Sequence, residues 1–209
     1  MRFRVGTLLL LVVLSLGACA QNFRPNLRLW NRIHILKAKT CAYSISSTKQ
    51  EQDLIFYCNL ARLDGQLFVK TILKPYLEAK GDTDMSDPYI SSLIAELNRL
   101  PRLKPLWSSQ LLTKMAKDYA TSSGKAGIIG HENFDQRFSS LYHSGKTVGE
   151  NCAYSQQNAL NAVIDLLIDD GIESLGHRHN ILSQVFSRVG VGIASHKNYN
   201  NVWVMEFTN

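Results

Sequence analysis

The stretch SLGHRHNIL, residues 174–182, places two histidines on either side of an arginine, directly ahead of Asn-Ile-Leu. Imidazole is the side chain that changes charge near neutral pH, and it is the commonest metal ligand in proteins. The stretch is open to three interpretations: a reaction centre, a metal site, or ordinary packing that carries polar side chains. Two further stretches, GHENFDQRF (130–138) and VGEN (148–151), also gather polar residues that a core would not favour. Together the three stretches define the candidate site.

The residues around these stretches predict helices in the first part of the chain. Thr48 followed by Glu51 is a capping box, which opens a helix that runs to about Leu63. Ser108 is expected to cap a later helix. Apolar residues keep a helical period of 3.6 residues over four further segments: 66–79, 89–100, 108–124 and 159–171.

Strands are expected later in the chain. Residues 188–195 and 202–206 alternate between apolar and other side chains across a polar loop, which predicts an antiparallel hairpin. Residues 146–154 form a short strand or an extended segment. Gly190 and Gly192 lie in the predicted hairpin and permit close backbone approach. The fold class is therefore α+β, with a small sheet covered by helices.

Residues 1–20 have the composition of an export signal, with two arginines, an apolar run from residue 5 to 16 and then small residues. Leu16-Gly17-Ala18-Cys19 resembles a bacterial lipobox, in which Cys19 becomes the lipid-modified first residue. Cleavage before Gln21 is the alternative. We favour the lipobox, because a cysteine has no structural use inside a discarded signal. The sequence thus predicts an exported protein, either tethered to the cell envelope through Cys19 or secreted.

Residues 21–47 are expected to be a basic linker or arm. Between residues 22 and 40 there are five basic residues and no acid. Three arginines recur every four residues: Arg24, Arg28 and Arg32. Three apolar residues recur every three: Leu27, Trp30 and Ile33. The segment is either an arm packed on the domain or a membrane-surface helix. Elsewhere the basic residues are scattered, so the net charge of +6 does not indicate a nucleic-acid partner.

The cysteines outside the signal are Cys41, Cys58 and Cys152. Export permits a Cys41–Cys58 disulfide. A free buried thiol is equally natural at Cys58, which lies on the apolar side of a helical pattern. The absence of a CxxC pair argues against a cysteine-based zinc site.

The order of the motifs, His…Glu-Asn…Gly-His-Arg-x-Asn-Ile-Leu followed by Val-Gly-Val-Gly, resembles the CAP/SCP superfamily of cysteine-rich secretory, antigen 5 and pathogenesis-related-1 proteins. The similarity is closest to its short prokaryotic-type members and runs from about Thr48 to Phe207. It implies a CAP/SCP domain at residues 48–209. The implied fold is an α-β-α sandwich with a small, largely antiparallel central sheet and a central cleft.

The resemblance also implies a tetrad of two histidines and two acids in that cleft, which in some members holds a divalent ion. His131 and His177 match the two histidines, and Glu150 matches the first acid. His179 occupies a variable position and is expected to be solvated or to cap a turn. The second acid stays open among three residues: Asp169, Asp170 and Glu173.

Asp170 is the favoured second acid, because Asp-Asp-Gly ahead of Ser-x-Gly-His-Arg is similar to one branch of the family. The alternative is that Asp170 only holds Arg178 or a loop amide. Two imidazoles and a carboxylate suit Zn²⁺ or another divalent cation. A serine nucleophile at Ser174 is less well supported, because no Gly-x-Ser-x-Gly elbow exists and Ser174 is better placed to cap the turn before His177.

These observations favour a monomeric binding protein for a lipid, a peptide or an envelope component. A metal-dependent hydrolase that uses His131, Glu150 and His177 is the alternative, and a structural envelope protein is a third interpretation. Arg137 is expected to pair with a carboxylate under the cleft. His143 and His196 are expected to be exposed in loops. Four residues are assigned to the core: Phe134, Ile181, Leu182 and Phe186.

Overall fold

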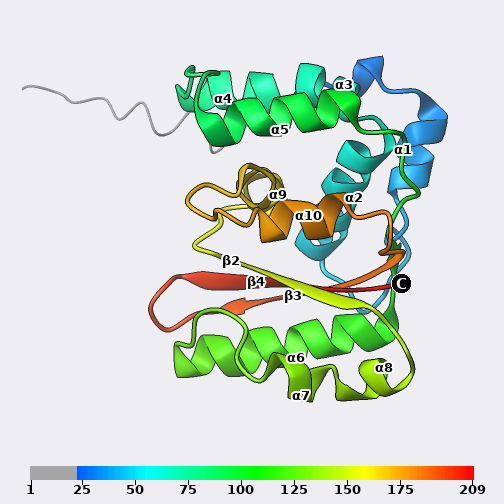
Figure 1. The fold of residues 1–209 in the computed structure, drawn as a ribbon, viewed down its shortest axis with the longest axis vertical. Helices are drawn as coiled ribbons and strands as arrows, with labels where there is room; N and C mark the ends of the chain where they lie inside the picture. The colour runs from blue at the N-terminus through cyan, green and yellow to red at the C-terminus, as the bar shows by residue number, and fades with distance from the viewer. Residues whose placement is uncertain (1–22) are drawn as a thin grey trace, which may run out of the picture.

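The computed structural model describes residues 23–209 as three layers, with a sheet between two groups of helices (Figure 1). Helix α6 (Gln110–Ala126) covers one face of the sheet, and α2, α9 and α10 lie over the other (Figure 1). The predicted α-β-α sandwich is confirmed. The expected export signal at residues 1–20, with Cys19, lies outside the described residues.

The sheet has four strands in the order β1-β3-β4-β2. Strand β4 pairs antiparallel with both β3 and β2, and the short β1 pairs parallel with β3. The predicted hairpin is therefore confirmed as β3 and β4, and the extended segment before Tyr154 is the edge strand β2. The strands are β1 (Trp107–Ser108), β2 (Val148–Tyr154), β3 (Arg188–Ser195) and β4 (Asn201–Thr208).

The helices begin and end where local chemistry satisfies their backbone. The capping box of α2 is present, because Glu51 N–H donates to Thr48 Oγ1 and Thr48 N–H donates to the Glu51 carboxylate. The expected cap at Ser108 was wrong by one residue. Ser108 belongs to β1, and the side chain of Ser109 caps α6. The other elements are α2 (Lys49–Leu63), α3 (Gly65–Phe68), the π-helix η4 (Val69–Leu73), α4 (Lys74–Lys80), α5 (Pro88–Arg99), α7 (Phe134–Arg137), α8 (Ser139–His143), α9 (Ala159–Ile168) and α10 (Gly176–Leu182).

Helix α6 lies directly on β3 because glycines leave room for its backbone. A Cβ atom at Gly190 would lie 2.0 Å from the carbonyl carbon of Leu112, and one at Gly192 would lie 2.4 Å from that of Ala116. Such distances are far below van der Waals contact, so no other residue fits without moving the helix. The close approach predicted at these two glycines is confirmed.

The segment before α2 is an arm packed on the domain. It contains the 3₁₀ helix η3 (Leu27–Leu29) and helix α1 (Arg32–Ala38). Trp30 is buried between them, and its indole N–H donates to Thr71 Oγ1 at 2.9 Å. Asn59 of α2 holds the end of the arm, since its amide donates to the Ala38 carbonyl at 3.1 Å.

Two other sequence expectations concern thiols and membrane spans. Cys41, Cys58 and Cys152 are all free and buried, so the alternative of a Cys41–Cys58 disulfide is not realised. Burial raises the pKa of Cys58 to about 12, as expected for an inert core thiol. Within residues 23–209, no helix combines the length and the apolar character that crossing a bilayer requires.

Candidate functional site

The three polar stretches meet at the edge strand β2. His131 lies in the loop after α6, Glu150 lies on β2, and His177 lies in the first turn of α10. The imidazole centroids of His131 and His177 are 6.4 Å apart. Residues that are up to 46 positions apart in the sequence thus form one surface site, which we call the histidine pair.

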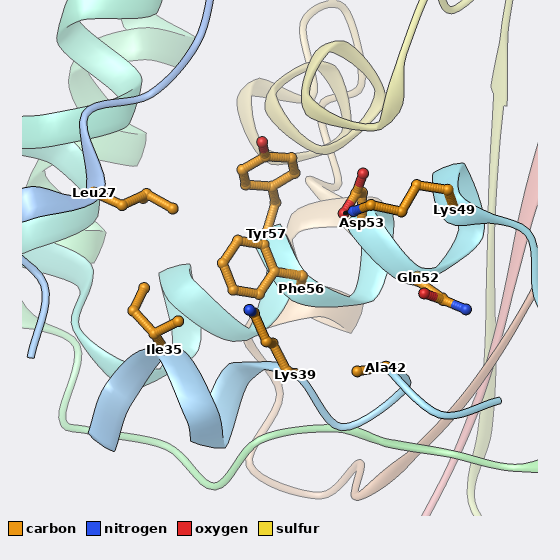
Figure 2. Close-up of a pocket in the computed structure, with 9 residues that line it drawn as sticks. All are labelled: Leu27, Ile35, Lys39, Ala42, Lys49, Gln52, Asp53, Phe56 and Tyr57. Carbon is orange, nitrogen blue, oxygen red and sulfur yellow. Dashed lines mark hydrogen bonds and ion pairs between the residues drawn. The ribbon is translucent and has the colours of Figure 1, made fainter. Parts of the chain in front are cut away.

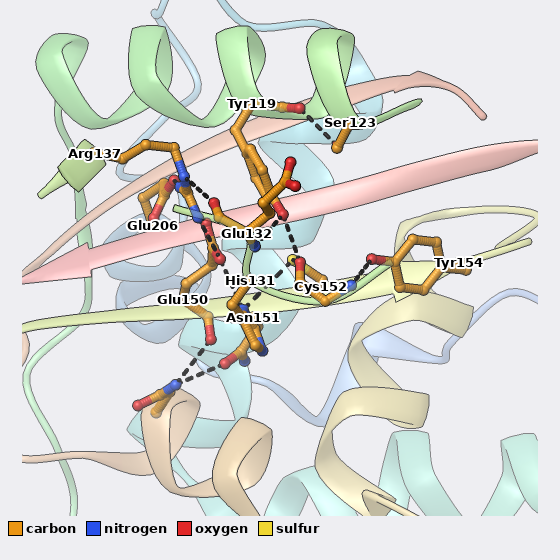
Figure 3. A network of polar contacts seen from close by, with 12 residues as sticks. Tyr119, Ser123, His131, Glu132, Arg137, Glu150, Asn151, Cys152, Tyr154 and Glu206 are labelled. Carbon is orange, nitrogen blue, oxygen red and sulfur yellow. Dashed lines mark hydrogen bonds and ion pairs between the residues drawn. The ribbon is translucent and has the colours of Figure 1, made fainter. Parts of the chain in front are cut away.

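Glu150 orients His131. Nδ1 of His131 donates to Glu150 Oε1 at 2.7 Å, and the carboxylate is buried (Figure 3). Two N–H groups of Arg137 donate to the same carboxylate, at 2.6 and 2.9 Å. Burial alone would raise the pKa of Glu150, but the hydrogen bonds from His131 and Arg137 outweigh it and hold the pKa below its usual value. Glu150 is therefore an anion at neutral pH, and the expected ion pair of Arg137 is confirmed.

Arg137 also contacts a second glutamate that the sequence analysis did not single out. Glu206 lies directly opposite Glu150 in the β2–β4 register, and its Oε1 accepts from Arg137 at 2.9 Å. Its side chain is fully buried, and Oε2 has no hydrogen-bond partner within residues 23–209. Burial, and next the negative charge of Glu150, raise the pKa of Glu206 to about 10. At neutral pH the two glutamates together thus carry one negative charge, which balances the positive charge of Arg137.

Asp169 orients His177. Nδ1 of His177 donates to Asp169 Oδ1 at 2.6 Å, while Oδ2 accepts the backbone N–H groups of His177 and Arg178 at 2.9 and 3.2 Å. One buried carboxylate therefore caps α10 and fixes the ring. Asp170, the acid favoured by the sequence analysis, is exposed and makes none of these bonds. The reason is that α9 ends at Ile168 and Asp169 adopts a left-handed conformation, φ 60° and ψ 39°, which turns its side chain toward α10.

Both histidines are arranged alike. Each uses Nδ1 for a carboxylate, and among the described residues neither Nε2 has a hydrogen-bond partner. The side chain of His131 is 46% exposed and that of His177 is 21% exposed, so the site opens to solvent. A carboxylate that accepts from Nδ1 leaves the lone pair on Nε2, which is the usual environment of a metal-binding histidine. The residues present therefore fit a divalent cation.

Cys152 adds a second candidate set of ligands. Ligand atoms of His131, Glu150 and Cys152 lie within 4.8 Å of one another, so this group could hold a metal ion. The thiol Sγ is 3.9 Å from His131 Nδ1. Burial, and next the charges of Glu150 and Glu206, raise the pKa of Cys152 well above its usual value, which disfavours the thiolate that a metal requires. The sequence feature that could have identified Cys152 is its spacing from Glu150, because residues two apart on a strand lie on the same face of the sheet.

Asparagines join the two halves of the site. Asn151 on β2 donates to the backbone carbonyl of His177 at 3.0 Å. Asn180 on α10 donates to the carbonyl of Glu150 at 3.2 Å and to Asn151 Oδ1 at 2.8 Å. These amides lie in a strand and a helix, and they fix α10 against β2.

The remaining polar candidates lie away from the histidine pair. Ser174 is exposed, does not cap α10 and makes no hydrogen bond to His177. His179 and His143 are exposed, as expected. The expectation that His196 is exposed was wrong, because its Nε2 donates to the Ile128 carbonyl and its Nδ1 accepts two N–H groups of the β3–β4 turn.

The four residues assigned to the core differ in burial. Ile181, Leu182 and Phe186 are buried, as expected. Phe134 is only half-buried, because it lies in the short helix α7 at the surface, where its ring stacks near that of Phe138 with centroids 4.6 Å apart.

Comparison with known proteins identifies relatives of the fold. Residues 93–207 match the family model CAP, described as the cysteine-rich secretory protein family. No curated protein matches the chain. Among solved structures, an outer surface protein of Borrelia burgdorferi is 22% identical, with a TM-score of 0.42, over 60% of this chain and 92% of its own.

Two other solved structures are more distant in sequence. A cysteine-rich secretory protein of Staphylococcus aureus is 17% identical, with a TM-score of 0.41, over 57% of this chain; the match spans 38% of the staphylococcal chain. Venom allergen-like protein 4 of Schistosoma mansoni is 13% identical, with a TM-score of 0.41, over 77% of this chain and 88% of its own.

Proposed function

This chain belongs to the cysteine-rich secretory protein (CAP) family, and we propose that it is an exported, membrane-tethered binding protein whose histidine pair holds a divalent cation. The observation that carries the proposal is the matched arrangement of His131 and His177, each with a buried carboxylate on Nδ1 and a free Nε2. The ligand class that we propose is a lipid, a peptide or another component of the cell envelope.

Zn²⁺ is the cation that the donor set suits best, because imidazole nitrogen is among its preferred ligands. Glu150 and Asp169 would act as the outer carboxylates that hold the two rings. When bound, the ion would act as a Lewis acid toward an oxygen of a ligand. Arg137 does not oppose the cation strongly, since its own charge is balanced by Glu150.

Binding is favoured over hydrolysis by the state of the acids. A general base needs a carboxylate that can reach the substrate and take up its proton. Glu150 is buried and already accepts from His131 and from two N–H groups of Arg137. Asp169 is buried and accepts three N–H groups. Neither acid is free for this role, and Ser174 has no histidine partner.

The tether rests on the lipobox at Cys19, which also supports export to the cell envelope. A Cys19→Ser chain expressed in a bacterial host should lose incorporation of labelled fatty acid, while a Cys152→Ser chain should retain it. Labelling of the Cys19→Ser chain equal to that of wild type would refute the tether.

Zinc titration by calorimetry tests the metal site, with the chain from Gln21, which contains every described element. We expect binding with a Kd in the micromolar range or tighter, lost in His131→Ala/His177→Ala. The matched control is His143→Ala/His179→Ala, which removes two exposed imidazoles and should bind as wild type does. Circular dichroism would establish that each variant is folded.

A third variant, Cys152→Ala, separates the two ligand sets. Retained affinity in this variant supports the histidine pair, whereas lost affinity assigns the ion to His131, Glu150 and Cys152. If zinc produced no heat of binding when added to folded wild type, the metal proposal would be refuted. Zinc-dependent hydrolysis of ester or peptide substrates, abolished by His131→Ala, would favour the hydrolase.

A further inference from the structure

Helix α1 has one side fixed to the domain. Trp30 and Ala38 are buried at its two ends, and Ile35 is half-buried against α2. Ile35 also lines a cavity of about 420 Å³ between the arm and α2, where it faces Phe56 (Figure 2). These contacts set the rotation of α1 about its own axis, and so determine which side chains point away from the protein.

The outer side of the arm carries apolar side chains that the fold does not use. Leu29 is 61% exposed, Ile33 is 57% exposed and Leu36 is 60% exposed. Ile33 and Leu36 are three residues apart on α1 and so lie on one face of that helix, whereas Leu29 belongs to the preceding 3₁₀ helix η3. Large apolar residues exposed singly are ordinary, but three on the two short helices of one arm form an interaction surface.

Basic side chains border Ile33 and Leu36 on both sides of α1. At about 100° per residue, the order around α1 is Arg32, Leu36, Ile33 and Lys37, covering about 140°. The apolar pair is thus in the centre with one cation at each margin, and all four residues are exposed. Arg28, also exposed, lies in η3, ahead of α1. We call these six residues the basic-apolar face: Arg28, Leu29, Arg32, Ile33, Leu36 and Lys37.

The charges of this face are not used within the protein. Among the described residues, none of Arg28, Arg32 and Lys37 takes part in an ion pair. Residues 22–40 contain no acid that could compensate them. A second copy of the chain would bring the same uncompensated positive charge against this face, which disfavours self-association.

We propose that the basic-apolar face lies on an anionic phospholipid surface. Amphipathic helices with central apolar residues and flanking Lys or Arg lie in the plane of the membrane, with the apolar side chains at the boundary of headgroups and acyl chains. The long basic side chains reach back to the lipid phosphates. The proposal requires neither acylation of Cys19 nor a metal ion, so it fails or stands independently of the proposed function. It explains why the arm is both packed on the domain and amphipathic.

Vesicle sedimentation tests this proposal with the unacylated chain from Gln21. Wild type should bind phosphatidylcholine vesicles that contain phosphatidylglycerol, more weakly at high salt, and should bind pure phosphatidylcholine poorly. Removing the three exposed apolar side chains of the arm should weaken binding about tenfold or more, since it removes the apolar area that would insert into the membrane: Leu29→Ser/Ile33→Ser/Leu36→Ser. A matched control replaces three equally exposed apolar residues elsewhere and should bind as wild type does: Leu111→Ser/Ile129→Ser/Val185→Ser.

Three results would overturn the proposal. Wild type could fail to bind the anionic vesicles, or the control variant could lose as much binding as the arm variant. Gel filtration could show a dimer that only the arm variant dissociates, which would assign the face to a second copy. All six substituted positions are exposed, and thermal melts would verify that both variants fold.

Discussion

Replacing Glu206 with glutamine should make the stability of this protein less sensitive to rising pH. Glu206 is fully buried between Arg137 and Glu150, and its pKa is raised to about 10 in the folded chain, against 4.5 for an ordinary glutamate. Glutamine has the same shape as a protonated glutamate. It keeps an oxygen that accepts from Arg137, and it offers an N–H toward Glu150, but it has no proton to lose.

The sign and size of the effect follow from proton linkage. Between about pH 5 and pH 10 the folded wild type holds a proton on Glu206 that the unfolded chain has released. The stabilisation is complete below the unfolded pKa and is lost as pH rises through this window. A difference of one bound proton between the folded and the unfolded chain changes the free energy of unfolding by about 3 kcal/mol over two pH units. We therefore expect the free energy of unfolding of Glu206→Gln, relative to that of wild type, to rise by about 3 kcal/mol between pH 6 and pH 8.

Urea unfolding of both chains at several pH values measures this difference directly. All other titrating groups are common to the two chains, so their contributions cancel to first order. Glu78→Gln, which removes an exposed carboxylate on α4, is the matched control and should run parallel to wild type. Stability curves of Glu206→Gln and wild type that stay parallel from pH 6 to pH 8 would refute the buried proton.

Three other substitutions or treatments test local features. Asp169→Asn should cost about 1–3 kcal/mol in urea unfolding, because it removes the charged cap of α10, whereas Asp170→Asn should stay near zero; equal losses would contradict the assignment. Gly190→Ala should cost about 3 kcal/mol by forcing α6 off the sheet, and Gly176→Ala, which meets only a side-chain oxygen at 3.5 Å, should be tolerated. Cys58 should react with a thiol reagent only as fast as the protein unfolds, and immediate labelling of the folded chain would show that it is accessible.

The α-β-α sandwich was implied by the resemblance to the CAP/SCP superfamily. Sequence periodicity was sufficient for the α+β class, since helix and strand patterns repeat over many residues and reinforce one another. It was insufficient for the second acid. Asp169 and Asp170 are adjacent and chemically identical, and the choice depends on where α9 ends and which residue adopts the left-handed conformation. A one-residue difference of this kind is set by tertiary packing of α9 and α10, which the local pattern does not contain.

The buried polar residues show the same limit. The alternation of Val202, Val204 and Glu206 predicted their shared face, but a carboxyl group inside an apolar layer makes sense only once Arg137 is known to reach it from α7. His196 was assigned to the surface because a polar loop follows it. It is buried because its Nε2 donates to the carbonyl of Ile128, which is distant in the sequence, while its Nδ1 accepts the N–H groups of Asn198 and Tyr199 in the turn that follows. The contact with Ile128 is the part that the local sequence does not reveal.

The strand order has a consequence for how the protein is made. Strand β4 follows the other three strands in the sequence, yet it lies between β3 and β2 and provides every backbone partner of β2 in the sheet. A nascent chain that has emerged only as far as the polar loop before Asn201 therefore lacks the strand with which β2 pairs. Such a chain also lacks Glu206, one of the two glutamates that contact Arg137. During vectorial synthesis or translocation the candidate site remains unassembled until the last strand arrives.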